Sequence, residues 1–266
     1  MPPERLSVTI VETMKIAVCI KQVPTREWQP RLNDQKTWIR EQDVSYEMNE
    51  PDAYALEEAL RLREKHGGEV VVCSAGPARV QTVIREALAR GADRAIHVQG
   101  DSLGAADAFV LAEALASAMK DETFDLVLTG LQSDDQGHGQ TGVILAERLG
   151  IPSSTIIMDV QIENNALRVK RELEGGWFQW IAMPLPALLT IQSGINQLRY
   201  ATLKGIMAAK KKEIRTAPLP EGLQPSQQIV SLSVPTRSKQ TQMITGSPAD
   251  AAKELVRRLR EDARAL

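Results

Sequence analysis

The sequence has few cysteine, histidine and aromatic residues. Its 266 residues include two cysteines and three histidines, and 4% of them are aromatic. Two cysteines do not make the framework of a small disulfide-stabilised domain, and the scattered histidines lack the ligand spacing of a zinc site, so we expect no metal. Cys19 and Cys73 each lie within an apolar run. We expect both to be buried free thiols, which fits a cytoplasmic protein.

An excess of charge and a long apolar run are also absent. The formal net charge is −2, which indicates no general attraction to nucleic acid or to acidic membranes. No apolar run approaches the roughly 20 residues that cross a bilayer. We therefore expect no nucleic-acid partner and no direct membrane insertion. Residues 1–13 are too polar for a secretory signal, and we interpret them as an N-terminal extension outside the fold.

What the sequence does contain is a regular alternation of strand-like and helix-like segments. Apolar runs at residues 15–20, 69–75, 94–98 and 125–129 predict strands, and the segments that follow them predict helices at 52–66, 78–90, 105–120 and 140–149. This alternation predicts an α/β fold, Rossmann-like, with a parallel sheet flanked by helices on both faces. Because these strands are apolar throughout, both faces of the sheet should be covered.

After Pro152 the pattern changes. Residues 154–163, 166–173 and 177–183 alternate in polarity, and Asn164-Asn165 and Gly175-Gly176 separate them. Such dipeptides are typical of hairpin turns, so these segments predict a β-meander against or extending the sheet, before residues 187–191 return as a strand. We assign residues 14–191 to one nucleotide-binding domain with this meander.

The C-terminal part lacks a periodic apolar pattern over residues 192–246, where several prolines favour extended chain. A long unpatterned stretch is improbable inside a compact domain. We therefore interpret it as a partner-recognition loop and an arm that lies on another protein. At residues 247–266, Ser247 as N-cap and Pro248 at the first helical position predict a last helix. Its narrow apolar stripe packs either on this chain or, as we expect, on a partner subunit.

The connection after the strand at 125–129 is the most informative segment. The strand ends at Gly130, a loop of small polar residues follows, and Gln140 and Thr141 open a helix. This order places the unpaired amides of a helix N-terminus at the sheet edge where ligands bind, which favours phosphate. The loop has no Walker A lysine, so an ordinary connection stays an alternative. Asp134, Asp135 and His138 lack a nucleophile and indicate acid–base catalysis only weakly.

Several segments, in order, resemble the β subunit of the electron transfer flavoproteins. The similarity covers nearly all of residues 14–266, and its most specific part begins with Arg199-Tyr200-Ala201-Thr202-Leu203 and ends in three lysines. The other segments that carry it are residues 15–24, 48–52, 74–77, 87–93, 130–142 and 185–187.

The resemblance implies an electron carrier subunit rather than a stand-alone enzyme. Its partner would be the electron transfer flavoprotein α subunit, which holds most of the FAD, and the heterodimer would carry electrons from acyl-CoA or other dehydrogenases to a flavoprotein-quinone oxidoreductase. Most members bury an AMP in the β subunit, whereas electron-bifurcating members hold a second FAD there. The resemblance implies these nucleotide-binding residues: Cys19, Asn49, Glu50, Pro51, Asp52, Ala75, Gly76, Gly130, Gln132, Ser133, Asp134, Gly137, His138, Gly139, Gln140 and Thr141.

The loop at residues 132–139 departs from the common family pattern, in which an Ala-Ile pair precedes acidic residues. Gln140-Thr141-Gly142 keeps the ordinary pattern and favours AMP, whereas the extra glycines leave room for a larger ligand. We therefore expect AMP first and FAD second.

The resemblance also implies a docking site for dehydrogenases. The matching leucine of the family inserts into a groove of the partner, so Leu203 is the predicted anchor, although a buried core position is the alternative. The alternative for the three lysines at residues 210–212 is a solvent-exposed helix face without a partner. The proposed docking residues are Arg199, Leu203, Lys204, Ile206, Lys210, Lys211 and Lys212.

Two other classes share this fold pattern. A universal-stress-type nucleotide-binding module would form homodimers and need no arm. An ATP-pyrophosphatase-type ligase would need a Ser-Gly-Gly-x-Asp loop after the first strand, where Lys21-Gln22-Val23-Pro24 stands instead.

Overall fold

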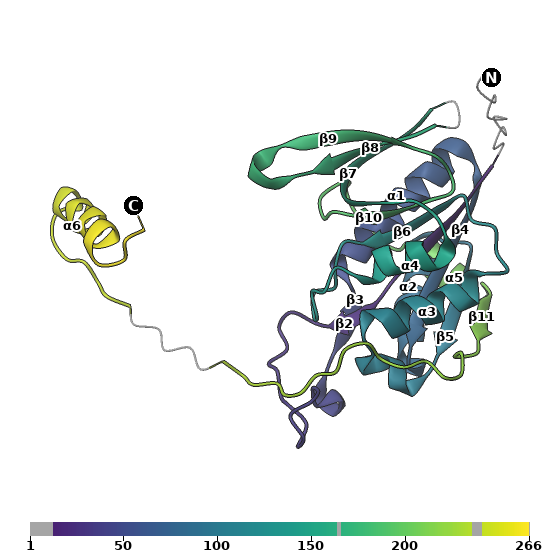
Figure 1. Ribbon diagram of the computed structural model, residues 1–266, viewed down its shortest axis with the longest axis horizontal. Coiled ribbons are helices and arrows are strands. Elements are labelled where there is room, and N and C mark those ends of the chain that lie inside the picture. Colours follow the sequence, from purple (N-terminus) through teal and green to yellow (C-terminus); the bar gives the residue numbers. More distant parts are fainter. Residues whose placement is uncertain (1–12, 164–165, 236–240, 266) are drawn as a thin grey trace, which may run out of the picture. The chain divides into compact units, whose positions relative to one another are not determined.

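A computed structural model describes residues 13–163, 166–235 and 241–265. The chain divides into two compact units, residues 1–231 and 232–266, which are described separately. The first unit contains the sheet and the helices that position the site (Figure 1).

One nine-stranded sheet forms the first unit, in the order β11-β5-β4-β1-β6-β10-β7-β8-β9. All pairings from β11 to β7 are parallel, and β7–β8 and β8–β9 are antiparallel. This confirms the predicted parallel sheet and shows that the meander extends it. The parallel strands are β1 (Met14–Cys19), β4 (Gly68–Gly76), β5 (Arg94–Gln99), β6 (Leu126–Gly130), β10 (Ala187–Ile191) and β11 (Ile214–Ala217), followed by β7 (Ser153–Glu163), β8 (Ala166–Glu172) and β9 (Phe178–Met183).

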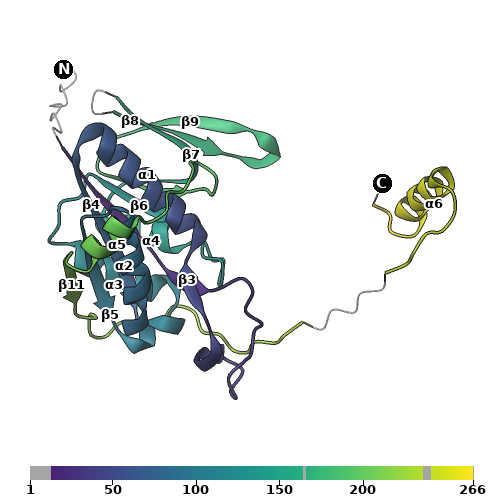
Figure 2. The same cartoon turned by 180° about the vertical axis from the view of Figure 1, so that it is seen from behind.

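Helices cover both faces of the parallel part. Ile16 and Val18 of β1 belong to one buried core with α1 and α2, whereas Ala17 and Cys19 belong to the core under α3 and α4. Successive side chains of a strand point to opposite faces, which explains why β1 is apolar throughout. The helices are α1 (Glu50–His66), α2 (Gln81–Arg90), α3 (Ala108–Met119), α4 (Thr141–Leu149) and α5 (Leu203–Ala209); Figure 2 shows the side of α1, α2 and α5.

Short elements complete this unit. The strands β2 (Gln22–Pro24) and β3 (Tyr46–Met48) form a separate antiparallel pair. The helix predicted at 105–120 begins at Ala108, as α3, because Asp107 is its N-cap and the Asp107 carboxylate accepts the Val110 N–H at 2.9 Å. The 3-10 turns are η1 (Glu41–Asp43), η2 (Ala78–Val80), η3 (Asp101–Ala105) and η4 (Glu174–Gly176), the last forming the predicted turn at Gly175-Gly176. The predicted turn at Asn164-Asn165 lies outside the described residues.

Residues 192–246 contain more regular structure than the sequence pattern indicated. They include α5 and β11, and β11 pairs in parallel with β5 at the edge of the main sheet. The interpretation of the whole segment as an unpatterned arm was therefore wrong for this part. The physical reason is that β11 has four residues and only Ala217 is buried, so it has too short an apolar alternation to be recognised. The domain boundaries themselves stay predictions.

The second unit contains α6 (Pro248–Glu261). Ser247 is its N-cap, as predicted, since the hydroxyl accepts the Asp250 N–H at 3.2 Å. Leu255 and Val256 are exposed within this unit, and α6 has no buried residue. The assignment of α6 to a partner subunit stays a prediction.

Candidate functional site

The site lies where β1 and β6 end and where the loop of residues 131–140, the β6–α4 loop, begins. Asp52, near the start of α1, joins the two strand ends because its carboxylate accepts the Lys21 N–H at 2.7 Å and the Gly130 N–H at 2.9 Å. A Cβ on Gly130 would lie 2.3 Å from Oδ1 of Asp52 and 2.7 Å from Pro51. A glycine is therefore required here for close approach of the backbone to α1.

Asn49 fastens the β6–α4 loop from the same side. Its side-chain amide donates to the Gln132 carbonyl at 3.0 Å and its oxygen accepts the Asp134 N–H at 2.9 Å. The side chain is 1% exposed. Both ends of this amide bind loop backbone, so Asn49 shapes the loop.

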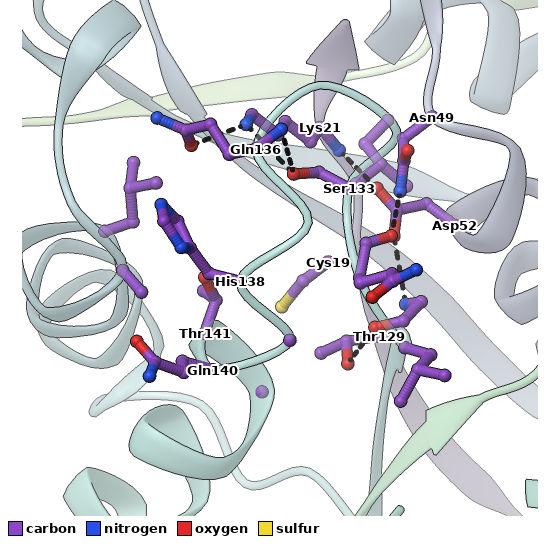
Figure 3. Close-up of a pocket in the computed structure, with 18 of the residues that line it drawn as sticks. Cys19, Lys21, Asn49, Asp52, Thr129, Ser133, Gln136, His138, Gln140 and Thr141 are labelled. Carbon is purple, nitrogen blue, oxygen red and sulfur yellow. Dashed lines mark hydrogen bonds between the residues drawn. The ribbon is translucent and has the colours of Figure 1, made fainter. Parts of the chain in front are cut away.

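Lys21 follows β1 and was not among the residues predicted from the sequence. Its ammonium group donates to Asp135 at 2.7 Å, to Gln136 at 2.9 Å and to Ser133 at 3.3 Å. It thus holds the outer part of the β6–α4 loop, as Figure 3 shows. A lysine directly after the first strand was the available signal, but the sequence did not show which loop it would reach.

The first residues of α4 line the cavity, and two glycines shape the loop that leads to them. Gly137 and Gly139 have positive φ of 64° and 63°, a conformation that glycine adopts without strain. Gln140 precedes α4 without a side-chain cap, and the first amides of a helix have no partner within the helix. A Cβ on Gly142 would lie 2.7 Å from Oγ1 of Thr129, so this helix end packs closely on the sheet.

These elements enclose one cavity, which brings most of the predicted nucleotide residues together (Figure 3). The predicted residues that line it are Cys19, Asn49, Asp52, Ala75, Gly130, Gln132, Ser133, His138, Gly139, Gln140 and Thr141. Leu131, Gln136 and Gly142 of the predicted segment 130–142 line it as well, and the lining residues outside every predicted segment of the site are Lys21, Ile20, Ala108, Leu111, Leu115 and Thr129. The leucines of α3 form an apolar wall, and their helical spacing signalled a buried face but not a ligand.

Five predicted residues do not line this cavity: Glu50, Pro51, Gly76, Asp134 and Gly137. Glu50 forms an ion pair with Arg26, and Asp134 lies 3.5 Å from the same guanidinium group. Pro51 packs against Gly130, whereas Gly76 lines a neighbouring cavity with Arg79. These residues support the loop or the adjoining surface rather than the cavity wall.

Two buried acidic groups affect the electrostatics of the cavity. Burial raises the pKa of Asp52 to about 7, although hydrogen bonds from the Lys21 and Gly130 amides oppose this. Burial, with smaller effects from Cys73 and Asp52, raises the pKa of the Cys19 thiol well above its usual value. Cys19 and Cys73 are both buried and free, as predicted. A protonated Cys19 presents an apolar, unreactive surface to the cavity.

The second predicted surface is the segment of residues 199–212, the α5 segment. Leu203 is 83% exposed and Met207 is 63% exposed, so the core interpretation of Leu203 is excluded. Ile206 is 44% exposed, and Lys204, Lys210 and Lys211 are exposed as well. The structure thus places an apolar patch with three lysines on the outside of α5.

Two of the predicted docking cations, Arg199 and Lys212, bind other groups of this chain. Arg199 forms ion pairs with Glu57 at 2.7 Å and with Glu64 at 2.5 Å. Lys212 is partly buried and donates to the carbonyls of Leu88 and Ala92, and burial lowers its pKa. Both cations are therefore held by acceptors of their own chain, and their part in docking stays a prediction. A residue count showed the charge but not its partners.

Comparison with known proteins identifies the family of this chain. A family model described as "Electron transfer flavoprotein domain" matches residues 36–221. The chain belongs to the electron transfer flavoprotein family. It is 36% identical over 261 residues to electron transfer flavoprotein subunit beta of Methylophilus methylotrophus, covering 93% of this chain and 98% of that one.

Other electron transfer flavoprotein β subunits match to a similar extent. The chain is 38% identical to the subunit of Thermoanaerobacterium thermosaccharolyticum over 257 residues, covering 92% of this chain and 98% of that one. It is 35% identical to the human subunit over 255 residues, covering 93% and 97%. The matches span both the β6–α4 loop and the α5 segment. Among the described residues, no helix is both long and apolar enough to cross a membrane.

Proposed function

We propose that this chain is the β subunit of a heterodimeric electron transfer flavoprotein. Together with an α subunit it would carry electrons from acyl-CoA or other dehydrogenases to a flavoprotein-quinone oxidoreductase, as a carrier rather than a stand-alone enzyme. Family membership supports this proposal, and so does the presence of a cavity at the sheet edge and an exposed apolar surface on one chain. We propose a cytoplasmic location, which the two free thiols support.

The observation that carries the nucleotide proposal is the start of α4. Gln140 and Thr141, at a helix N-terminus without a side-chain cap, line a cavity whose apolar wall includes Leu111 and Leu115. A helix N-terminus favours phosphate, and an apolar wall suits a nucleoside. We propose that AMP binds here, with its phosphate at Gln140 and Thr141. A ligand that binds only the folded chain stabilises it, by about 2.7 kcal/mol at a hundredfold excess over its Kd.

The FAD of the heterodimer would be held mainly by the α subunit. Flavin supplies the electron transfer, and the role of this chain is to bind and orient the assembly against its partners. Because α6 has no buried residue in its own unit, we propose that α6 packs on the α subunit. The chain expressed alone is then expected to aggregate or to melt without cooperativity.

A second candidate is an electron-bifurcating β subunit with its own FAD in place of AMP. A specific observation favours a larger ligand. Gln136 and His138 line both the cavity described above and a second one, whose wall includes Trp38. A ligand longer than AMP would pass these two side chains and occupy the second cavity.

The test is to purify the heterodimer, denature it and quantify the released nucleotides. One AMP and about one FAD per heterodimer support the first candidate, and two FAD without AMP support the second. Release of FAD alone would refute a nucleotide site in this chain.

A matched pair of variants tests where the phosphate binds. Thr141→Glu places a negative charge at the helix N-terminus, which suits the helix dipole but repels phosphate. Thr141→Gln has a similar size without the charge. We expect the glutamate variant alone to lose AMP while its far-ultraviolet circular dichroism stays unchanged. Equal AMP content in both variants would place the phosphate elsewhere.

A further inference from the structure

The connection between β10 and α5 leads directly to Leu203, and apolar packing holds it only weakly. It consists of residues 192–202, and its apolar side chains Leu198 and Ala201 pack on the core while only partly buried. An open cavity of about 480 Å³ is lined by most of residues 197–202 and by parts of α1 and α2. A segment with so few buried apolar contacts opens easily unless polar contacts hold it.

One stripe of α1 supplies such polar contacts; α1 and α5 lie on the same side of the sheet (Figure 2). The Arg199 guanidinium binds both carboxylate oxygens of Glu57, at 2.7 and 3.2 Å, and those of Glu64, at 2.5 and 3.1 Å. Arg61 donates to the Gln197 carbonyl at 3.2 Å. Positions 57, 61 and 64 repeat at helical spacing, so all three side chains lie on one face of α1.

Glu57 is the centre of these contacts. It is 4% exposed and also accepts a hydrogen bond from Arg61 at 2.9 Å. Although burial raises the pKa of Glu57, hydrogen bonds from Arg199 and Arg61 lower it overall, so Glu57 stays ionised at neutral pH. A bidentate contact between an arginine and a carboxylate fixes the geometry of both partners. Glu57 therefore fixes the position of Arg199 on α1.

Contacts on both sides of Arg199 fix the rest of the path to α5. Before it, the Asn196 amide donates to the Glu58 carboxylate at 3.0 Å. After it, Thr202 is the N-cap of α5, because its hydroxyl accepts the Gly205 N–H at 3.0 Å. Leu203 thus begins a capped helix four residues beyond the Arg199 ion pairs.

We propose that Arg199 is a positioning residue, which holds Leu203 in its docking position through Glu57 and Glu64 and does not itself contact the dehydrogenase. This inference rests on the proposed function and on the predicted docking role of Leu203. A segment that is ordered before binding loses less conformational entropy when the partner binds, so it binds more tightly.

A direct contact between Arg199 and the partner is the competing role. Both carboxylates that bind Arg199 belong to its own chain, so they already neutralise its charge. Lys204 and Lys211 are exposed, and no described carboxylate lies within 4.0 Å of their ammonium groups. The free positive charge of the α5 segment is therefore on its lysines, which can steer an acidic partner.

The test uses the complete heterodimer with a purified acyl-CoA dehydrogenase as electron donor, and it measures KM for the heterodimer separately from kcat. Arg199→Met removes both ion pairs but leaves Glu57 bound to Arg61. Arg148→Met is the matched control, since Arg148 pairs with Glu113 on the other face of the sheet. We expect Arg199→Met to raise KM about fivefold at unchanged kcat, and the control to stay within about twofold.

A double variant separates positioning from direct contact. If Arg199 acts through Leu203, Arg199→Met adds nothing to Leu203→Ala, and both the double variant and Leu203→Ala alone have a KM about thirtyfold above that of the unchanged protein. Any fall in melting temperature that Arg199→Met causes should be the same in both backgrounds. Arg199→Lys keeps the charge but not the bidentate contact, so its KM should lie between those of the unchanged protein and Arg199→Met.

Each other outcome overturns the inference in a distinct way. If the two effects on KM multiply, Arg199 contacts the partner directly. If Arg199→Met behaves like Arg148→Met while Leu203→Ala raises KM, docking stands without a positioning role for Arg199. If Arg199→Met is misfolded by circular dichroism, Arg199→Lys with and without Leu203→Ala decides by the same comparison. If Leu203→Ala leaves KM unchanged, the docking role of Leu203 fails as well, and if the unchanged heterodimer accepts no electrons, the proposed function fails first.

Discussion

The β6–α4 loop and the α5 segment are held in place in the same way but present different kinds of surface. Each has a glycine in close contact with a neighbouring element: Gly130, the last residue of β6 before the loop, approaches Asp52, and a Cβ on Gly205 would lie 2.3 Å from the Ala89 carbonyl oxygen. Each is also held by polar groups at its base, Asn49 and Asp52 in one and Arg199 and Lys212 in the other. The loop turns backbone amides toward a cavity, whereas α5 turns apolar side chains outward.

The difference shows that rigidity serves two kinds of recognition. A phosphate is bound by amides whose positions are fixed, so the β6–α4 loop presents backbone. A protein partner is bound by side chains that fill its pockets, so α5 exposes Leu203 on a fixed support. Substitutions in one region at a time should therefore affect nucleotide binding and partner binding separately.

Gly130→Ala should cause the largest change. The added Cβ meets the Asp52 carboxylate, the Asp52 backbone nitrogen at 2.8 Å and Pro51, and none of these is a flexible chain end. Overpacking costs about 1–3 kcal/mol, and loss of the Asp52 hydrogen bond adds to it. We expect the free energy of unfolding to fall by about 3 kcal/mol in urea denaturation, with loss of bound nucleotide. An unchanged denaturation midpoint would show that the backbone relaxes at this point.

Leu203→Ala should separate function from stability. The side chain is 83% exposed, so the melting temperature and nucleotide content should not change. Loss of a pocket-filling anchor costs about 2 kcal/mol of binding, which is roughly thirtyfold in affinity. Electron transfer rates with a dehydrogenase at varied concentrations measure this effect. Full activity in a stable Leu203→Ala variant would show that the docking site does not depend on Leu203 of α5.

Lys212→Met and Lys211→Met compare a lysine that is hydrogen-bonded within the chain with an exposed neighbour. Lys212 donates to two backbone carbonyls, and leaving these buried acceptors unpaired costs about 1–3 kcal/mol. Lys211 is exposed, and its substitution should change stability by less than about 0.5 kcal/mol. Thermal denaturation of both variants measures the difference. Equal melting temperatures of the two variants would show that the hydrogen bonds of Lys212 do not stabilise the fold.

The pH dependence of stability should show the titration of Asp52. Its pKa is about 7 in the folded chain and near 3.8 when unfolded, so the folded state binds more protons between these values. Stability from this group therefore rises as pH falls, by about 1 kcal/mol from pH 8 to pH 6. Asp52→Asn should abolish this component, so the difference in unfolding free energy between the two proteins should be nearly constant above about pH 8 and should grow steadily as the pH falls below about 7. A difference that is constant with pH would show that Asp52 does not titrate there.

Part of the site was predictable because it depends on local order. The strand ending at Gly130, the glycine-containing loop and the helix at Thr141 are contiguous, and the order alone places amides at the sheet edge. The exposure of Leu203 was also expected from the resemblance and from its polar neighbours. Lys21, Leu111 and Leu115 were not predicted, because they approach the loop only when distant segments fold together.

The sequence by itself determined the α/β class, the strand and helix order and the position of the β6–α4 loop, because hydrophobic periodicity and glycine positions act over a few residues. Only the tertiary structure decided which polar groups were already paired. It bound Asn49 to the loop, Arg199 to two glutamates and Lys212 to two carbonyls. It also added β11 to the sheet and left Phe178 and Trp180 of β9 exposed. Such pairings depend on residues far apart in the chain, whose distances no local pattern specifies.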